Sequence, residues 1–276
     1  MRIDFHAHAF PDALAPRAIA ALEAELLEEG AQARFDGKLG TLIEQLRQHH
    51  LDAAVVCSIA TKPSQFDPIL KWSQAIRDGA FGAEPARRII PLLSVHPADP
   101  DWRKHIEQTA AAGFKGLKIH PYYQNFILDS PEMLDYLRCA RDQGLLVVSH
   151  TGFDIAFPRE RICDPARVAR VASELPDLDF VATHLGGWED WDEVERHLTG
   201  RPITMEISYA FGRLPDSRIR DLLLRHPAER LLLGSDWPWN SHAEVLPRLM
   251  QLALPPERLD ALLGGNAARL LQLQSF

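Results

Sequence analysis

Eight short apolar runs, each followed by an amphipathic stretch, constrain the fold of this chain more than any other feature. The runs are continuous and rich in Val, Ile and Leu, which is typical of parallel strands buried on both faces. Strands that alternate with helices in this way are joined by right-handed crossovers within one parallel sheet. The predicted strands are Ile3–Phe5, Ala53–Ile59, Ile89–Val95, Phe114–Ile119, Leu145–Ser149, Phe180–Thr183, Ile203–Ser208 and Leu231–Gly234.

The stretches between these runs place apolar residues at helical spacing. A ninth helix is predicted over Glu257–Leu273 at the end of the chain. Residues 10–40 form a predicted insertion after the first strand, with a helix over Ala18–Glu28. The eight regular helices are predicted at Thr41–His49, Asp67–Asp78, Trp102–Ala112, Glu132–Gln143, Pro165–Glu174, Glu189–Leu198, Asp216–Arg225 and Ala243–Ala253.

A parallel sheet of eight strands either stays open or closes into a barrel. The 276 residues allow ~34 residues for each strand–helix pair, which is close to the size of a βαβ unit. No G-x-G-x-x-G or G-x-x-x-x-G-K-[ST] motif follows a predicted strand, so a nucleotide-binding open sheet loses support. We therefore predict an α/β fold of one domain, a (β/α)8 TIM barrel over residues 1–276.

Composition excludes several classes of protein. A hydrophobic content of 46% and a charged content of 25% are ordinary for a globular protein. The formal net charge of −8 gives no basic footprint for nucleic acid, and no apolar run reaches the roughly 18 residues of a membrane span. Three unclustered cysteines and the lack of a charged-then-apolar leader favour a soluble protein of the reducing cytoplasm.

Histidines gather at the ends of the predicted strands. Active sites of such barrels are built where the strands end. Of the 12 histidines, those without a shared role would scatter over helices and loops, so this clustering indicates a site at one rim. The rim histidines are His6, His8, His96, His120, His150 and His184.

The first strand ends in a His-x-His pair. His6 and His8 are two residues apart on an extended segment, so both side chains project to one side. Neutral imidazole is the commonest metal ligand, and two imidazoles make half of a tetrahedral site. A chance His-x-His on an edge strand is the alternative, and the other rim histidines count against it.

Short motifs follow the strands in barrel order over essentially the whole chain. They are His6-Ala7-His8, Lys118-Ile119-His120-Pro121, His150-Thr151-Gly152, His184-Leu185-Gly186-Gly187, Gly234-Ser235-Asp236-Trp237-Pro238 and the closing Gly264-Gly265-Asn266. Together they resemble the amidohydrolase superfamily. The resemblance is to the amidohydrolase-related branch that contains aminocarboxymuconate semialdehyde decarboxylase and many predicted metal-dependent hydrolases.

The resemblance implies one divalent metal ion, usually zinc, with manganese or another divalent ion as alternatives. Three imidazoles and one carboxylate suit Zn²⁺ and leave a position for water, whose pKa the metal lowers to about 7. The resemblance also makes His184 a catalytic residue near the metal, while Asp236 serves as both ligand and proton shuttle. The implied ligands are His6, His8, His150 and Asp236.

A second metal is a weaker alternative. Related amidohydrolases with two metals use a carboxylated lysine at the end of the fourth strand, a position that Lys118 would take, with His184 on the second metal. The branch resembled here typically holds one metal. We therefore interpret Lys118 and His120, which share a strand face, as residues that bind substrate or order the ligands.

Further residues near the strand ends are candidates for the pocket. Arg159 and Arg161 lie in a long loop, where they either bind a substrate carboxylate or remain solvated. Glu206 is predicted to be buried and needs a partner, so it either orients a metal ligand or forms a structural pair. The predicted pocket walls are Tyr122, Tyr123, Trp237, Trp239 and Asn240.

The predicted function is hydrolysis, in which a metal-bound water attacks an ester, lactone or amide carbonyl of a small molecule. Non-oxidative decarboxylation is the alternative, and it uses the same ligands. A cation in the pocket that binds a substrate carboxylate would discriminate the two. A metal-free binding barrel is a third hypothesis, against which the intact ligand set argues. The resemblance also suggests a homodimer.

Overall fold

Eight parallel strands form the centre of the molecule, as the apolar runs predict. The computed structural model describes residues 1–27 and 32–273. Several strands end before the apolar run does, because the last residues of the run turn into the loops that carry the site. The strands are β1 (Ile3–Ala7), β2 (Ala53–Cys57), β3 (Ile89–Leu92), β4 (Gly116–Ile119), β5 (Leu146–Ser149), β6 (Phe180–Ala182), β7 (Thr204–Glu206) and β8 (Leu231–Leu232).

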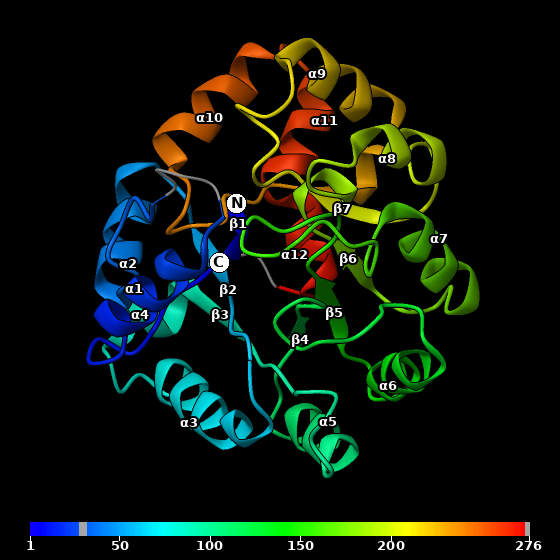
Figure 1. The fold of residues 1–276 in the computed structure, drawn as a ribbon. Helices are drawn as coiled ribbons and strands as arrows, with labels where there is room; N and C mark the ends of the chain where they lie inside the picture. Colours follow the sequence, from blue (N-terminus) through cyan, green and yellow to red (C-terminus); the bar gives the residue numbers. More distant parts are fainter. Residues whose placement is uncertain (28–31, 274–276) are drawn as a thin grey trace.

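Two ladders and two short links close the strands into a ring. The ladders run β1–β2–β3 and β4–β5–β6–β7–β8. Between β3 and β4, Leu93 pairs with Leu117 and accepts a hydrogen bond from the amide of Lys118 at 2.7 Å. Between β8 and β1, the amide of Phe5 donates to the carbonyl of Leu233 at 2.7 Å. Helices surround the strands (Figure 1), so the predicted (β/α)8 barrel is confirmed.

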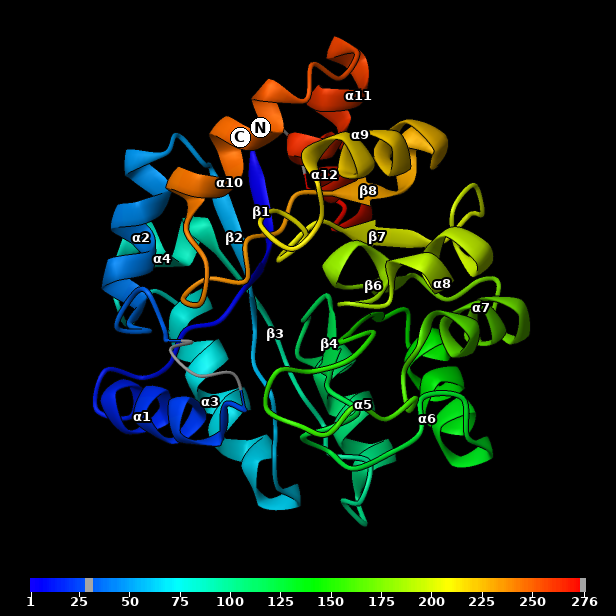
Figure 2. The ribbon, with the colours of Figure 1, turned by 45° about the horizontal axis from the view of Figure 1, so that its top comes forward.

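Eight helices lie close to their predicted positions. The short α4 (Ala83–Arg88) was not predicted. The insertion holds α1 (Ala15–Glu25), on the side of the barrel where α2 and α4 lie (Figure 2), and the last residue of its predicted range is outside the described residues. The regular helices are α2 (Leu39–Gln48), α3 (Phe66–Arg77), α5 (Trp102–Ala111), α6 (Pro131–Asp142), α7 (Pro165–Glu174), α8 (Trp191–His197), α9 (Asp216–Arg225) and α10 (His242–Gln251).

The prediction of one continuous ninth helix over Glu257–Leu273 is wrong. The segment divides into α11 (Pro256–Asp260), a wider helical turn over Ala261–Gly265, and α12 (Asn266–Leu270). A side chain at Gly264 would collide with the backbone carbonyl of Met1. The close approach of the first strand therefore requires glycine at this position and interrupts the helix.

Two layers of apolar side chains hold the barrel together. The inner layer includes Ile3, Phe5, Val148 and Leu232, and Leu271 next to α12 joins it. This places α12 against the end of the barrel where the strands begin. The outer layer packs the other strand faces against the surrounding helices. The inner layer fills the barrel, so polar chemistry is left to the opposite end.

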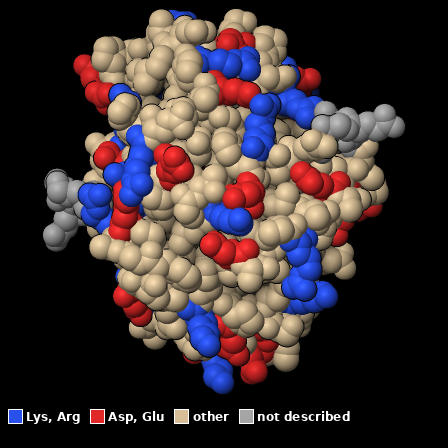
Figure 3. Space-filling view, turned by 90° about the vertical axis from the view of Figure 1, so that its left-hand side faces the viewer, with Lys and Arg blue, Asp and Glu red and all other residues tan. Residues whose placement is uncertain are grey.

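The surface carries charges of both signs. On the face shown in Figure 3, Lys and Arg side chains are interspersed with Asp and Glu, without a large region of one sign. Among residues 1–27 and 32–273, none of the helices combines the length and the apolar character that a bilayer crossing requires.

Candidate metal centre

A bulge in β1 aims both histidines of the His-x-His pair into the barrel mouth. Three residues of β1, from Asp4 to Ala7, advance against two residues of β2, so the strand alternation shifts there. Before the bulge, Phe5 packs into the inner apolar layer, whereas Ala7 packs into the outer one. His6 and His8 consequently both line the cavity at the mouth. Bulges next to active sites commonly redirect side chains in this way.

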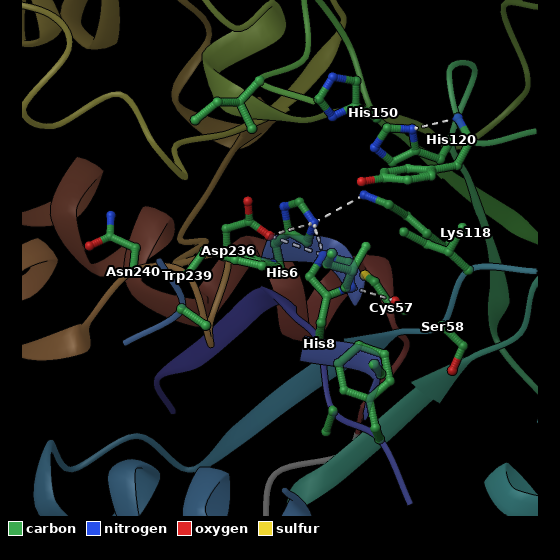
Figure 4. Close-up of a pocket in the computed structure, with 18 of the residues that line it drawn as sticks. His6, His8, Cys57, Ser58, Lys118, His120, His150, Asp236, Trp239 and Asn240 are labelled. Carbon is green, nitrogen blue, oxygen red and sulfur yellow. Dashed lines mark hydrogen bonds and ion pairs between the residues drawn. The ribbon is translucent and has the colours of Figure 1, made fainter. Parts of the chain in front are cut away.

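Three ligand atoms converge at this point of the mouth (Figure 4). The Nε2 atoms of His6 and His8 lie 3.1 Å apart. The Oδ1 atom of Asp236, from the loop after β8, lies 3.4 Å from the first and 3.0 Å from the second. Three of the four predicted metal ligands therefore form one group.

The hydrogen bonds of the two rings fix which nitrogen carries the proton. The Nδ1 atom of His6 lies 2.9 Å from a carboxylate oxygen of Glu206, and that of His8 lies 2.8 Å from the carbonyl of Cys57. Both partners only accept, so each Nδ1 is the N–H donor. In the neutral rings the two Nε2 lone pairs then face each other.

The charges of this group favour the binding of a cation. Burial, helped by the charge of Lys118, holds the pKa of His6 well below its ordinary value. Burial raises the pKa of Asp236, but His6 and His8 outweigh it and hold that pKa well below the usual range. The Nε2 atoms of the two imidazoles and an oxygen of the Asp236 carboxylate face one another. A divalent metal ion fits this donor set, because it satisfies all three acceptors at once.

His184 lies between this group and His150. Its Nε2 lies 3.1 Å from the Nδ1 of His150, and its Nδ1 lies 2.9 Å from the hydroxyl oxygen of Ser208. Its backbone amide donates to Glu206 at 2.9 Å, so one buried carboxylate orients both His6 and His184. Burial lowers the pKa of His184 to about 4, which makes it a neutral side chain at neutral pH.

His150 lies apart from the three converging atoms. Its Nε2 lies 2.8 Å from the carbonyl of Phe153, an acceptor, so the free lone pair is on Nδ1, toward His184. Its ring stacks on that of His120 with centroids 4.2 Å apart. Asp154 lies 3.4 Å from the Nε2 of His120 and 3.6 Å from that of His150. The mouth therefore holds two groups of two histidines and one aspartate.

Lys118 places its ammonium group beside the first of these groups. The side chain is 1% exposed, and its Nζ lies 3.0 Å from the Nε2 of His6 (Figure 4). Within the part of the chain that the structure describes, no carboxylate forms an ion pair with it. Lys118 and His120 both line the cavity, as the sequence predicts.

The cavity has a volume of about 1210 Å³ and aromatic walls. Three of the predicted wall residues, Tyr123, Trp239 and Asn240, line it, and so do Trp188 and Tyr209. The other two predicted residues do not. Tyr122 turns away and donates to the carbonyl of Glu160 at 2.6 Å, and Trp237 is fully buried against Phe35.

The prediction that Arg159 and Arg161 bind substrate disagrees with their positions. Arg159 pairs with Glu189 at 2.8 Å, and Arg161 binds both oxygens of Asp190, the closer at 2.6 Å. Both side chains are more than half exposed, and neither belongs to the described cavity wall. Their charges are neutralised on the protein's own carboxylates, which the loop sequence did not reveal.

Three residues in or behind the site were not predicted from the sequence. Asp154 lies within the loop that drew attention for its arginines. Asp4 and His242 form a buried hydrogen bond behind the His-x-His strand, with Nε2 of His242 2.7 Å from the carboxylate. A signal for Asp4 was present, because Asp4, His6 and His8 alternate along β1. Nothing in the sequence brings His242 close to them.

A family model of the amidohydrolases matches residues 3–273, so the chain is an enzyme of the amidohydrolase family and the predicted resemblance is confirmed. A comparison with curated proteins finds no match.

Solved structures share the fold at low identity. An uncharacterised TIM-barrel protein from Bordetella bronchiseptica has a TM-score of 0.75 and 17% identity over 98% of each chain. A probable 2-pyrone-4,6-dicarboxylic acid hydrolase from Acinetobacter baumannii gives 0.67 and 16% over 99% of each. A dihydroxybenzoic acid decarboxylase from Polaromonas sp. JS666, with bound manganese and 2-nitroresorcinol, gives 0.67 and 11%, covering 100% of this chain and 98% of the other.

Proposed function

We propose that this amidohydrolase is a metal-dependent hydrolase of a small anionic molecule. The observation that carries the proposal is the convergence of three acceptor atoms, from His6, His8 and Asp236, within 3.4 Å of one another. His150 completes the ligand set through Nδ1, the nitrogen that its bond to Phe153 leaves free. One metal is proposed and not two, because Lys118 presents an ammonium group to His6.

The bound ion supplies Lewis acidity and makes a water molecule a nucleophile at neutral pH. Zinc suits three imidazoles and a carboxylate, and manganese is the ion in one similar structure. The residues around it handle the protons. Asp236 is a carboxylate at neutral pH and takes the proton of the attacking water. His184 is neutral and is oriented by Ser208. In this proposal it contacts the carbonyl group of the bound substrate.

Lys118 binds the negative charge of the substrate. A buried ammonium without a carboxylate partner in the described structure is costly, and an anionic group of the substrate removes that cost. The aromatic walls formed by Tyr123, Trp188 and Trp239 suit a flat or ring-shaped body. The substrate class is therefore a small ester, lactone or amide that carries a carboxylate.

Decarboxylation is the second candidate, and the position of Lys118 favours it specifically. Its Nζ is 3.0 Å from the Nε2 of His6, so a carboxylate bound there lies at the reaction centre itself and not at a distant part of the substrate. In that reaction the carbon–carbon bond breaks, CO₂ leaves, and a proton replaces it on the carbon. That proton comes from water, and His184 or Asp236 passes it to the carbon.

Isotopes separate the two reactions. The metal-loaded enzyme is screened against aromatic lactones and hydroxybenzoates, first in ¹⁸O-water and then in D₂O. Hydrolysis places one ¹⁸O in the product carboxylate and no deuterium on carbon. Decarboxylation places one deuterium on carbon and releases CO₂. We expect the isotope pattern of hydrolysis. The pattern of decarboxylation would reject hydrolysis and support the second candidate. If elemental analysis of protein purified without chelator finds no divalent metal, and added metal does not bind, the protein is a metal-free barrel.

A cytoplasmic location and a homodimer are also proposed. Cell fractionation and light scattering of the purified protein check them.

A further inference from the structure

Asp4 is a fully buried carboxylate that accepts four hydrogen bonds. It lies in β1, two residues before His6, and is 0% exposed. Its Oδ1 accepts from the backbone amides of His6 at 3.1 Å and Ser235 at 3.0 Å. Its Oδ2 accepts from the hydroxyl of Ser235 at 2.5 Å and from Nε2 of His242 at 2.7 Å. The side chain faces away from the cavity and touches no substrate space.

Three of these four bonds join the two segments that deliver the metal ligands. One amide belongs to His6, within the bulge that redirects the His-x-His pair. A bulge leaves a backbone group without its ladder partner, and Asp4 satisfies it. The other two bonds hold Ser235, the residue before Asp236. Asp236 itself has a positive φ of 64°. Its amide donates to the carbonyl of His6 at 2.7 Å, which is a further bond between the same two segments.

His242 holds the carboxylate from the opposite side. It is the first residue of α10, is 1% exposed, and donates from Nε2. Its Nδ1 is buried and has no hydrogen-bond partner among the described residues. Such an orphan is destabilising, so the position is poorly explained by stability alone. The bond to Asp4 is the hydrogen bond of this ring, which also lies near the ring of His49, with centroids 5.9 Å apart.

We infer that Asp4 and His242 form a positioning pair that sets the distance between His6 and Asp236, and with it the affinity and geometry of the metal centre. The inference rests on the proposed metal-dependent function. The pair acts through the bulge of β1 and the loop after β8, and neither residue takes part in the reaction.

The test compares His242→Leu and His242→Gln with a matched control. Leu removes the donor, whereas the Gln amide nitrogen lies near the position of Nε2 and restores it. The control is His226→Leu, because His226 is equally buried, donates Nε2 to the carbonyl of Ile203 and also has an unpartnered Nδ1. Cobalt(II) affinity by chelator competition and the cobalt absorption spectrum are measured in full-length protein. The ¹⁵N shifts of the imidazoles are recorded without metal.

His242→Leu and Asp4→Asn are expected to weaken cobalt binding by about 10–100-fold, the usual cost of losing a partner that orients ligands. They should also change the cobalt spectrum and loosen the fixed Nδ1–H tautomers of His6 and His8. His242→Gln should recover both readouts, and His226→Leu should change neither, although it lowers stability.

Equal effects of His226→Leu and His242→Leu would reduce the pair to a structural role and overturn the inference. So would an unchanged cobalt spectrum together with unchanged tautomers in folded His242→Leu. Failure of the wild-type protein to bind cobalt rejects the proposed function alone. The imidazole shifts then still decide whether the pair positions His6.

Discussion

The barrel mouth contains two groups with the same composition and different geometry. His6, His8 and Asp236 form one, and His120, His150 and Asp154 form the other, and the ligand atoms of each lie within 4.8 Å of one another. In the first group each histidine donates a hydrogen bond from Nδ1 to an acceptor behind it, so its Nε2 points into the cavity. In the second group, His150 donates a hydrogen bond from Nε2 to the carbonyl of Phe153, and its ring stacks on that of His120.

This difference teaches that orientation, and not composition, makes a metal centre. The partners behind the first group, Glu206 and the carbonyl of Cys57, turn the two Nε2 atoms toward each other. Asp236 and the ammonium group of Lys118 lie beside them. Stacking and a hydrogen bond satisfy the rings of the second group without an ion. We interpret His120 and Asp154 as part of the substrate pocket, whereas His150, which lies next to both groups, is the proposed fourth ligand.

The largest expected effect comes from breaking each group with the same substitution. His8→Gln should lower metal affinity by more than about 100-fold, because it removes a ligand and not merely a partner of one. Turnover should fall to background. His120→Gln should leave metal affinity unchanged. Competition with a metal-binding dye measures both.

His150→Ala tests whether His150 belongs to the metal centre or to the second group. If Nδ1 of His150 is a ligand, metal occupancy collapses while the fold survives, because the side chain lies at the mouth, away from the packed layers. Unchanged metal content in the folded variant would assign His150 wholly to the second group. Equal losses in His8→Gln and His120→Gln would contradict the comparison itself.

His184 connects the two groups, and its loss should affect rate more than metal. His184→Asn keeps a similar volume and removes an imidazole that contacts His150 and Ser208. Turnover should fall by about 10²–10⁴-fold, as for a general acid–base residue, with metal content retained. Loss of metal together with activity would make His184 a ligand and revive the two-metal alternative through Lys118.

The fold was largely predictable from the sequence, because apolar runs and helical periodicity repeat eight times. The prediction of one continuous ninth helix was wrong because of a tertiary contact, in which Gly264 closely approaches the backbone of Met1. No local pattern contains that contact. The rim position of His6, His8 and Asp236 was also predictable, because strand ends meet at one edge.

The finer arrangement of the site was not predictable, because it depends on which way loop residues turn. One-residue register in a loop decides whether Tyr122 or Tyr123 lines the cavity. The fate of Arg161 depends on Asp190, which comes from a different loop. Such pairings between loops leave no periodic signal in the chain.

Lys118 and Arg161 make a matched pair of cations. Lys118 lies in the cavity without a carboxylate partner among the described residues, whereas Arg161 pairs with Asp190 outside it. Lys118→Met should raise KM for an anionic substrate by about 10–150-fold, the cost of a lost hydrogen bond to a charged group. Arg161→Met should change KM less than about twofold, because an exposed ion pair contributes little. Steady-state kinetics with the substrate and its methyl ester measure the difference. An equal response of the neutral ester would show that Lys118 does not bind the charge.

The smallest expected effect is on stability in acid. Burial lowers the pKa of His226 to about 4, so the unfolded chain, with ordinary histidine values near 6.5, takes up the proton first as pH falls. The free energy of unfolding therefore decreases from about pH 6.5 toward pH 4, by ~1.4 kcal/mol per pH unit for each such histidine. His226→Gln should remove one histidine's share of this slope, and so should His120→Gln, whose pKa burial also lowers. Urea unfolding at pH 7, 6 and 5 measures the slopes in metal-free protein. Because neither residue is proposed as a ligand, adding metal should raise stability by the same amount in both variants as in the wild type. A smaller gain for His120→Gln alone would move the second group back toward the metal.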